Sequence, residues 1–509
     1  MISCTLLLVV VSFFVSAKET AANRHFRQSP SFGNYFADKR RPLLQTREYD
    51  SNFWMGRGMF DLNRRLKVLE SPIVGRAKNI VFFLGDGMSL STVTAARVYM
   101  EQTSGSSFPN GNASLSFEYF PYTGLARTYC VDKQVADSAC SSTAYMTGVK
   151  ANSGTLGVTG AVRENDCESS LEAKNRVDSI LQWAQKAGKS TGIVTTTRVT
   201  HASPAGGYAH SANRDWESSA PGDCLDIAQQ LVTQEPGIEL DVIMGGGRQE
   251  FLPKYINGNR EDGRDLIAEW KIRMKKNNQR YDYVRNKTEL SNLNLNNVDK
   301  LLGLFSMSHM SYTGTKELER DEPSLSEMTL AAIEVLRKNN NGYVLFVEGG
   351  RIDHAHHQNL AHMALTETIA FSKAVDVADT ITNPKNTLIV VTSDHSHTMT
   401  INGYPAREDS IIGEVDREEG PYSILSYANG PSASAQSYRK QMSKYGESFA
   451  LYPSLVPMST ETHGGEDVAV WARGPWAHLF VGSFEQNMLP LIMSYASCIG
   501  PNKEKCSNR

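Results

Sequence analysis

Four runs of apolar, β-prone residues, far apart in the chain, each lead into acidic, histidine or serine side chains. The runs occupy residues 79–84, 191–197, 343–347 and 387–393. Buried parallel strands have such near-continuous apolar sequences, and open α/β sheets bind ligands at the carboxyl ends of their strands. We therefore expect the polar residues that follow the runs to meet at one edge of a sheet. They are Asp86, His201, Ser203, Glu348, Asp353, His354, His356, His357, Asp394, His395 and His397.

A single large α/β domain with insertions is the fold class that this arrangement favours. The chain has 509 residues, more than one ordinary hydrophobic core usually serves, but the candidate ligands extend from position 86 to position 463. Helical patterns at 177–187 and 325–339 alternate with the strands, which predicts a large, mostly parallel sheet sandwiched by helices. Residues 406–460 break the pattern with glycine, proline, serine and charged residues. We expect them to form an inserted surface subdomain, after which residues 468–471 resume the sheet.

The two ends of the chain differ from this main domain, which we place at 77–498. Residues 1–17 are typical of a secretory signal peptide, whose apolar stretch is too short to span a bilayer. Residues 18–76 are basic and irregular and are interpreted as an N-terminal arm, with a candidate helix at 60–69. Residues 499–509 form a polar tail without the hydrophobic segment that a GPI anchor needs. The sequence thus predicts a secreted, extracellular protein without a transmembrane segment.

Cysteine count and charge agree with this location. Cleavage would remove Cys4 and leave six of the seven cysteines, an even number that suits an oxidising compartment. Asn112 and Asn286 begin glycosylation sequons. The net charge of −3, with both signs mixed, gives no reason to expect a nucleic-acid-binding module.

The segment 135–145 turns from an extended stretch into a helix, with Asp137 and Ser138 at the helix start. One interpretation is that Ser138 caps the helix, since serine and aspartate are favoured at that position. The other is that its hydroxyl is a nucleophile, which needs a base or a metal ion to ionise at neutral pH. Alone, the segment favours the cap. Metal ligands nearby favour the nucleophile, because Zn²⁺ lowers the pKa of a bound oxygen and a helix N-terminus stabilises a bound anion.

The histidines also have two interpretations. Any one of them is most simply explained as a hydrogen-bonded core or surface residue. Five of the 12 histidines, however, fall within the segments 348–357 and 394–397, and both segments contain carboxylates. The set as a whole therefore predicts metal binding.

Together these motifs closely resemble those of metazoan alkaline phosphatases, including insect members. The likeness extends from about residue 54 to residue 506 and implies an alkaline phosphatase-like fold with a crown-like inserted subdomain. The motifs are Gly-Asp-Gly-Met at 85–88, Asp-Ser-Ala at 137–139, His-Ala-Ser-Pro-Ala-Gly at 201–206, Glu-Gly-Gly-Arg-Ile-Asp-His-Ala-His-His at 348–357, Asp-His-Ser-His at 394–397 and Thr-His-Gly-Gly-Glu-Asp at 462–467.

The resemblance implies two zinc ions and one magnesium ion. Two imidazoles and a carboxylate also suit a catalytic zinc chemically, and an all-oxygen set favours magnesium. His201 would orient magnesium-bound water, while His354 and His397 would support ligands rather than bind metal. The implied ligands are Asp353, His357 and His463 for the first zinc, Asp86, Asp394 and His395 for the second, and Asp86, Ser203 and Glu348 for magnesium.

The resemblance further implies hydrolysis of phosphate monoesters by a homodimer, through a phosphoserine at Ser138. Arg214 matches the family's phosphate-binding arginine, and its planar guanidinium suits two phosphate oxygens. Without the surrounding motif, a surface ion pair with Asp215 would be the better interpretation of Arg214. The leaving group needs little recognition, which predicts broad monoester specificity.

The cysteines follow the family pattern in part. It implies the disulfides Cys167–Cys224 and Cys498–Cys506. Cys130 and Cys140, a pair that insect members share, predict a third disulfide beside Ser138, and the alternative is two free buried thiols. The peripheral calcium site of vertebrate members is not predicted, because Ser306 replaces one carboxylate and another matches only as Glu322.

Two other classes of function compete with this one. A sulfatase or a nucleotide phosphodiesterase of the same superfamily would use related chemistry. Residues 138–142 lack the proline and arginine of the sulfatase motif, and the magnesium set that the phosphodiesterases lack is present. A binding protein without catalysis would have a broken ligand set, whereas the family-matched positions are intact.

Overall fold

The computed structural model describes residues 51–70, 72–104, 113–314, 321–416, 420–434 and 449–504. The chain divides into two compact units, residues 1–64 and 65–509, and the boundary falls within helix α2 (Ser51–Glu70). The predicted signal peptide, Cys4, Asn112 and Cys506 lie outside the described residues. Among the helices of the described ranges, none combines the length and the apolar character needed to cross a membrane.

A ten-stranded sheet forms the centre of the second unit, in the order β17-β2-β16-β8-β1-β7-β3-β4-β6-β5. The four predicted strands are β1, β3, β7 and β8. They are neighbours in the sheet, in the order β8-β1-β7-β3. The sheet is mostly parallel, as predicted, but β16 runs antiparallel to both of its neighbours. The bounds are β1 (Asn79–Gly85), β2 (Tyr122–Arg127), β3 (Ser190–Arg198), β4 (Val242–Gly246), β5 (Tyr281–Val284), β6 (Lys300–Leu304), β7 (Tyr343–Gly349), β8 (Thr387–Thr392), β16 (Val468–Arg473) and β17 (Gly482–Glu485).

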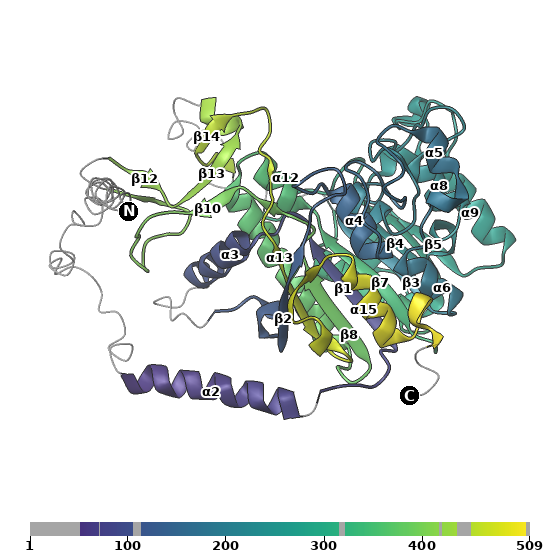
Figure 1. Cartoon of the computed structure of the whole chain (residues 1–509). Helices are drawn as coiled ribbons and strands as arrows, with labels where there is room; N and C mark the ends of the chain where they lie inside the picture. The colour runs from purple at the N-terminus through teal and green to yellow at the C-terminus, as the bar shows by residue number, and fades with distance from the viewer. Residues whose placement is uncertain are drawn as a thin grey trace, which may run out of the picture. The chain divides into compact units, whose positions relative to one another are not determined.

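Helices cover both faces of the sheet (Figure 1). One face is covered by α3 (Leu90–Thr103), α11 (Leu325–Leu336), α12 (Arg351–His357) and α13 (Ala361–Ile381). The other is covered by α4 (Ser138–Thr147), α6 (Ile180–Lys186), α7 (Ala202–Ala205), α8 (Ile227–Thr233), α9 (Leu266–Lys276) and α15 (Met488–Ser497). Two further short helices are α5 (Cys167–Leu171) and α10 (Lys287–Ser291).

This double cover explains why the strands are apolar along their whole length. Successive side chains of a strand point to opposite faces of its sheet. In β1, Phe82 and Leu84 therefore pack in the hydrophobic cluster that contains α15. Val81 and Phe83 pack in the cluster that contains α13.

The two predicted helices are confirmed as α6 and α11. Ser179 caps α6, and Ser324 caps α11 in a capping box with Glu327. Each helix then passes through a glycine with positive φ, Gly188 at 73° and Gly342 at 85°, before the chain enters β3 or β7. The helix expected at 60–69 is longer than predicted, because α2 already begins at Ser51.

The region predicted as an insertion contains small sheets of its own. Its strands form one three-stranded sheet, β10-β13-β14, and one two-stranded sheet, β11-β12, both separate from the central sheet. The strands are β10 (Met399–Ile401), β11 (Glu414–Val415), β12 (Tyr422–Ser423), β13 (Leu425–Gly430) and β14 (Ser454–Pro457). Because β10 precedes residue 406, this layer begins earlier than the sequence pattern suggested.

The carboxyl ends of β8, β1, β7 and β3 lie side by side. In the register, Leu84 of β1 pairs with Thr392 of β8 and with Glu348 of β7, and Glu348 pairs with Thr195 of β3. The residues that follow these strands therefore meet at one edge of the sheet, as predicted.

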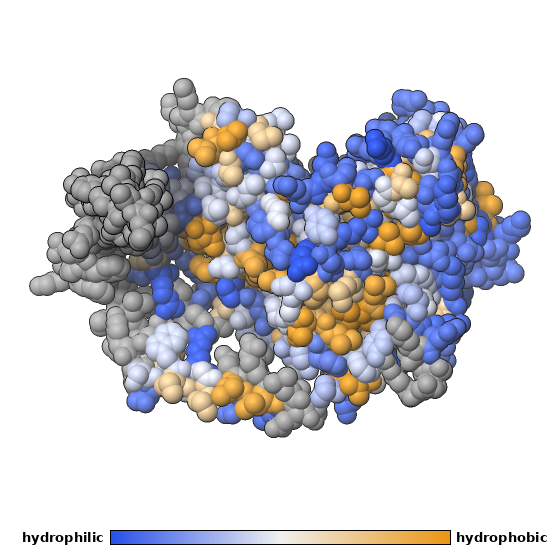
Figure 2. Space-filling model, viewed as in Figure 1, coloured by the Kyte–Doolittle hydropathy of each residue, from blue (hydrophilic) through white to orange (hydrophobic). Residues whose placement is uncertain are grey.

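The surface itself varies in character. The lobe that contains α5, α8 and α9 is mostly hydrophilic, whereas apolar side chains gather over α15 (Figure 2). Leu479, Leu491, Ile492 and Tyr495 line a shallow depression in that area. The clustered carboxylates and imidazoles lie instead at the carboxyl edge of the sheet.

Phe371 on α13 offers a test of this packing. Its buried ring contacts Phe83 and Phe117, with ring centroids 5.9 and 6.1 Å apart. Phe371→Ala should lower the free energy of unfolding by about 3–5 kcal/mol, because it leaves a cavity in the core. Thermal unfolding at fixed metal concentration measures the change. Leu330→Ala, at a position that is 41% exposed, is the control and should change stability by less than about 0.5 kcal/mol. Equal midpoints for the two variants would contradict the assigned packing.

Candidate active site

The turn after β1 places Asp86 among its partners. Gly87 has a φ of 67°, and a Cβ at this position would lie 2.4 Å from Nε2 of His397 and 3.2 Å from Cα of Asp353. Glycine is required here, because other residues disfavour this φ and would collide with the imidazole. The N–H of Gly87 donates to Oδ1 of Asp394 at 3.0 Å, which ties the ends of β1 and β8 together.

Ser138 is the first residue of α4, and Asp137 rather than Ser138 caps the helix. Oδ2 of Asp137 accepts from the N–H of Ala139 and Oδ1 from that of Cys140, both at 3.2 Å. The hydroxyl of Ser138 is therefore not used as a cap. It is buried and lies 3.2 Å from Nε2 of His395. The structure therefore excludes the cap interpretation of Ser138, whose hydroxyl faces the metal-ligand candidates, and its role as a nucleophile stays a prediction.

The rings of His357 and His463 each direct one nitrogen toward Asp353. Nδ1 of His463 donates to the carbonyl of Ala136 at 2.8 Å, and Nδ1 of His357 donates to the carbonyl of Glu461 at 2.6 Å. These bonds fix the ring protons on Nδ1 and leave a lone pair on each Nε2. The two Nε2 atoms are 3.1 Å apart, so the lone pairs repel each other unless a cation lies between them.

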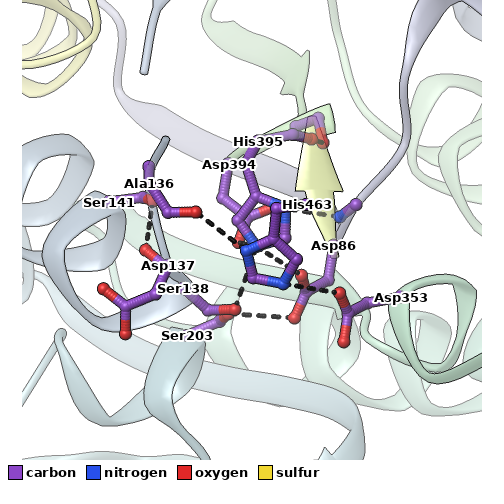
Figure 3. A network of polar contacts seen from close by, with 12 residues as sticks. Asp86, Ala136, Asp137, Ser138, Ser141, Ser203, Asp353, Asp394, His395 and His463 are labelled. Carbon is purple, nitrogen blue, oxygen red and sulfur yellow. Dashed lines mark hydrogen bonds and ion pairs between the residues drawn. The ribbon is translucent and has the colours of Figure 1, made fainter. Parts of the chain in front are cut away.

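The spacing of this first cluster suits zinc. Oδ1 of Asp353 lies 3.4 Å from Nε2 of His357 and 3.4 Å from Nε2 of His463. A tetrahedral zinc ion with bonds of 2.0–2.1 Å spaces its ligands about 3.4 Å apart. Burial lowers the pKa of both imidazoles, which favours the neutral form that binds metal. Figure 3 shows Asp353 and His463 turned toward each other, close to Asp86 and Ser138.

His397 belongs to the same cluster, but carboxylates engage both of its nitrogens. Nε2 donates to Oδ1 of Asp353 at 2.7 Å, and Nδ1 donates to Oε2 of Glu461 at 2.5 Å. Burial alone would lower the pKa of His397, but the two carboxylates outweigh burial and raise it to about 10. A protonated ring has no lone pair for a metal ion, so His397 acts on Asp353 and not as a ligand.

A second cluster surrounds Nε2 of His395. This atom lies 3.1 Å from Oδ2 of Asp394 and 3.6 Å from Oδ1 of Asp86, and all three side chains are fully buried. Oδ1 of Asp86 has no hydrogen-bond partner among the described residues. Burial raises the pKa of Asp86 well above its ordinary value, and the carboxylates of Asp394, Asp353 and Glu348 raise it further. A bound cation would relieve both effects.

A third cluster lies at the end of β7. Oε2 of Glu348 accepts hydrogen bonds from the hydroxyls of Thr195 and Thr197, whereas Oε1 has no hydrogen-bond partner within the described ranges. Ser203 donates to Oδ2 of Asp86 at 3.4 Å. Burial raises the pKa of Glu348 to about 7. Carboxylate and hydroxyl oxygens are ligands that magnesium accepts.

His201 also reaches this third cluster. One donor atom each from Asp86, His201 and Glu348 lies within 4.8 Å of the others. Nδ1 of His201 is buried and has no hydrogen-bond partner among the described residues. His201 thus has one ring nitrogen within reach of the third cluster and one ring nitrogen, Nδ1, without a hydrogen-bond partner among the described residues.

Arg214 pairs with Asp137 and not with Asp215. Nη1 donates to Oδ2 of Asp137 at 3.1 Å, and Nη2 lies 3.2 Å from Nε2 of His201. Burial alone would raise the pKa of Asp137, but Arg214 and the N–H groups of Cys140 and Gly154 hold it below its ordinary value. The charged Asp137 therefore both caps the helix of Ser138 and orients the guanidinium.

The described residues contain two disulfides, and one of them lies beside Ser138. Cys130 and Cys140 form one, so they are not free thiols, and Cys167 and Cys224 form another. The loop between Cys130 and Cys140 contains Asp137, Ser138 and the carbonyl of Ala136 that fixes His463. Cys498 is also disulfide-bonded.

Several residues near the site were absent from the sequence motifs. Thr195 and Thr197 belong to a run of three threonines at the end of β3, a signal that the sequence does contain. His309 lies in another segment, yet its ring centroid is 4.3 Å from that of His354. His354 itself contacts Arg351, with Nδ1 2.8 Å from Nη1.

The sequon residue Asn286 caps α10, and its side chain accepts from the N–H of Glu289 at 2.7 Å.

Known proteins resemble this chain over most of its length. Residues 77–499 match the family model described as alkaline phosphatase. The membrane-bound alkaline phosphatase of Bombyx mori is 45% identical over 486 residues, which cover 90% of this chain and 87% of the relative. The human tissue-nonspecific alkaline phosphatase is 43% identical over 493 residues, covering 91% and 92%.

Solved structures agree on the fold. A variant of the TAB5 alkaline phosphatase, described with Mg bound in the M3 site, superposes with a TM-score of 0.60 at 23% identity and covers 84% of this chain and 99% of its own. The Thermus thermophilus alkaline phosphatase gives a TM-score of 0.62 at 23% identity, covering 83% and 92%.

The chain therefore belongs to the alkaline phosphatase family, and its enzymatic activity is the hydrolysis of phosphate monoesters. The family depends on metal ions, and the three clusters above are the candidate sites for them. In the second cluster, donor atoms of Asp86 and His395 also lie within 4.8 Å of one of Asp353.

Proposed function

We propose that the chain hydrolyses phosphate monoesters through a phosphoserine on Ser138, at a centre with two zinc ions and one magnesium ion. The observation that carries this proposal is the place of the Ser138 hydroxyl. It stands at the first turn of α4, buried, 3.2 Å from Nε2 of His395, which belongs to the second cluster. A helix N-terminus also favours the phosphoryl anion.

The proposed ions follow from the donor atoms. Sites with imidazole nitrogen suit zinc, whereas an oxygen-rich site suits magnesium. The TAB5 structure described with Mg in its M3 site is consistent with a magnesium ion in this family. The proposed ligands are Asp353, His357 and His463 for the first zinc, Asp86, Asp394 and His395 for the second, and Asp86, Ser203 and Glu348 for magnesium, with His201 orienting water there.

When bound, the metal ions lower the pKa of the serine hydroxyl and of water and neutralise the phosphoryl oxygens. Oγ of Ser138 attacks phosphorus, the bond from phosphorus to the ester oxygen breaks, and the alcohol leaves. Water then attacks the phosphoserine, which releases phosphate and restores the hydroxyl. Arg214, held by Asp137, directs N–H groups at the phosphoryl oxygens throughout.

The choice of substrate distinguishes phosphate monoester hydrolysis from two related activities, sulfate ester hydrolysis and phosphate diester hydrolysis. Sulfatases and nucleotide phosphodiesterases share parts of such a centre, but a monoester dianion makes the fullest use of Arg214 together with three cations. A phosphate diester or a sulfate ester carries less charge and should react far more slowly.

One prediction of this proposal concerns Ser138. Ser138→Ala should leave the fold and the metal content nearly unchanged and should lower monoester hydrolysis by several orders of magnitude, because no phosphoserine can form. Acid quenching with labelled substrate measures the trapped phosphoenzyme. Ser141→Ala is the matched control, since Ser141 lies on the same helix but donates to the carbonyl of Asp137. Normal labelling of the Ser138→Ala protein would refute the assignment.

Another prediction of this proposal concerns the metals. Elemental analysis of the protein should give two zinc ions and one magnesium ion per chain. A chromogenic phosphate monoester should be hydrolysed well, and the corresponding diester and sulfate poorly. EDTA should abolish the monoester activity, and zinc with magnesium should restore it. A single zinc ion, or full activity after exhaustive chelation, would contradict the three-site centre.

The extracellular location of the protein, its assembly into a homodimer and the limits of its domains stay proposals. The disulfides fit an extracellular domain. Release from the cell is predicted from the sequence alone, and the Bombyx mori relative is named membrane-bound. A homodimer is supported by the edge strand β14, where Leu455 is 82% and Val456 50% exposed. Glycans on Asn112 and Asn286, the third disulfide to Cys506, the arm at 18–76 and the crown-like insertion at 406–460 are likewise proposed.

A further inference from the structure

We propose that Glu461, which lies outside every ligand set assigned above, positions all three ligands of the first zinc site and sets the affinity of that site. The proposal rests on the proposed function, because it takes Asp353, His357 and His463 as the zinc ligands. Glu461 touches no reacting atom and is therefore a positioning residue.

The carboxylate of Glu461 acts on Asp353 through His397. Glu461 is fully buried. Its Oε2 accepts from Nδ1 of His397 at 2.5 Å, and Nε2 of the same ring donates to Oδ1 of Asp353 at 2.7 Å. The imidazole thus stands as a rigid spacer between two carboxylates. A shift of Glu461 would pass directly to the atom of Asp353 that faces the two histidine ligands.

The other carboxylate oxygen anchors this chain of bonds. Oε1 of Glu461 accepts from the N–H of Thr398 at 2.8 Å and from its hydroxyl at 2.6 Å. Together with the bond to His397, these contacts give the carboxylate a single orientation. A buried carboxylate with three donors is costly to displace.

The backbone of Glu461 acts on the second ligand, His357. Its carbonyl accepts from Nδ1 of His357 at 2.6 Å, and its N–H donates to the carbonyl of His357 at 2.9 Å. The first bond fixes the tautomer that leaves Nε2 free, and the second holds the end of α12 against residue 461. Such partners of a metal ligand commonly change metal affinity by about 10–100-fold when they are removed.

The third ligand, His463, follows Glu461 by two residues. Strand β15 (His463–Gly464) pairs with β9 (Ser396–His397), and His463 is the register partner of His397. The segment that contains Glu461 and His463 is therefore joined to that of His397 twice, by the side-chain bond of Glu461 and by this short sheet. One buried residue consequently connects the two segments that supply the ligands, α12 and β15, with strand β9, which carries His397.

The test compares zinc binding in four proteins in buffers of defined free zinc concentration, with wild type as reference. Glu461→Ala should weaken one of the two zinc sites by about 10–100-fold and leave the other unchanged. Glu461→Gln keeps the size of the side chain and should have a smaller effect of the same kind. Glu367→Gln is the matched control, because Glu367 is also buried and also accepts from a backbone N–H, that of Thr313, away from the ligands.

The route through His397 is tested by a double-mutant cycle. His397→Ala should weaken the same zinc site, and adding Glu461→Ala should weaken it little further, because the side chain acts through the imidazole. Zinc release to a chelator, measured as two phases, should show only one phase accelerated in every Glu461 and His397 variant.

Several outcomes would overturn the proposal. They are unchanged zinc constants in both Glu461 variants, equal weakening of both zinc sites, or additive effects in the cycle. If Glu461→Ala does not fold, Glu461→Gln decides alone. A wild-type protein without zinc sites would refute the proposed function as well, whereas two zinc ions that bind with the same constants in wild type and in all Glu461 variants would refute only the role of Glu461.

Discussion

Mutual repulsion among buried carboxylates is the constraint on which the rest of this structure depends. Asp86, Asp394 and Glu348 stand at the carboxyl ends of three adjacent strands and are fully buried. Burial raises the pKa of Asp86, and the charges of the neighbouring carboxylates raise it further. Such an arrangement is unfavourable in an apolar sheet unless cations compensate it. The helices on both faces exclude water from the strands, and the clustered carboxylates make the carboxyl edge of the sheet the candidate metal centre.

The hydrogen bonds around this centre leave particular side-chain atoms free. Asp137 takes the cap of α4, which leaves the Ser138 hydroxyl available, and the same carboxylate holds Arg214. The carbonyls of Ala136 and Glu461 take the Nδ1 protons of His463 and His357, which leaves both Nε2 lone pairs toward the centre. The hydrogen bonds that these side chains make with the backbone and with neighbouring side chains thus decide which of their atoms remain free for chemistry.

Much of the fold and the candidate site was predictable from local sequence, and the reasons are specific. The four strands were visible because both faces are buried, which removes polar residues from positions such as 80–84. Helices α6 and α11 carried serine caps and C-terminal glycines. The antiparallel direction of β16 was not visible, because an apolar run has the same composition in either direction. Glu461 and His309 were missed for a related reason, since their roles come from contacts with distant segments.

The sequence by itself determined which residues can carry the chemistry: strands that end in carboxylates and histidines, and a serine at a helix start. Tertiary structure decided which atoms of those residues are free. Asp137, one residue before the serine, became both the cap and the partner of Arg214, in place of the neighbouring Asp215. His397 became a bridge between Asp353 and Glu461, although it lies two residues from His395, whose Nε2 faces Asp86. The physical reason is that periodicity and capping act over a few residues, whereas hydrogen-bond partners and electrostatic fields at this centre join segments separated by tens to hundreds of positions.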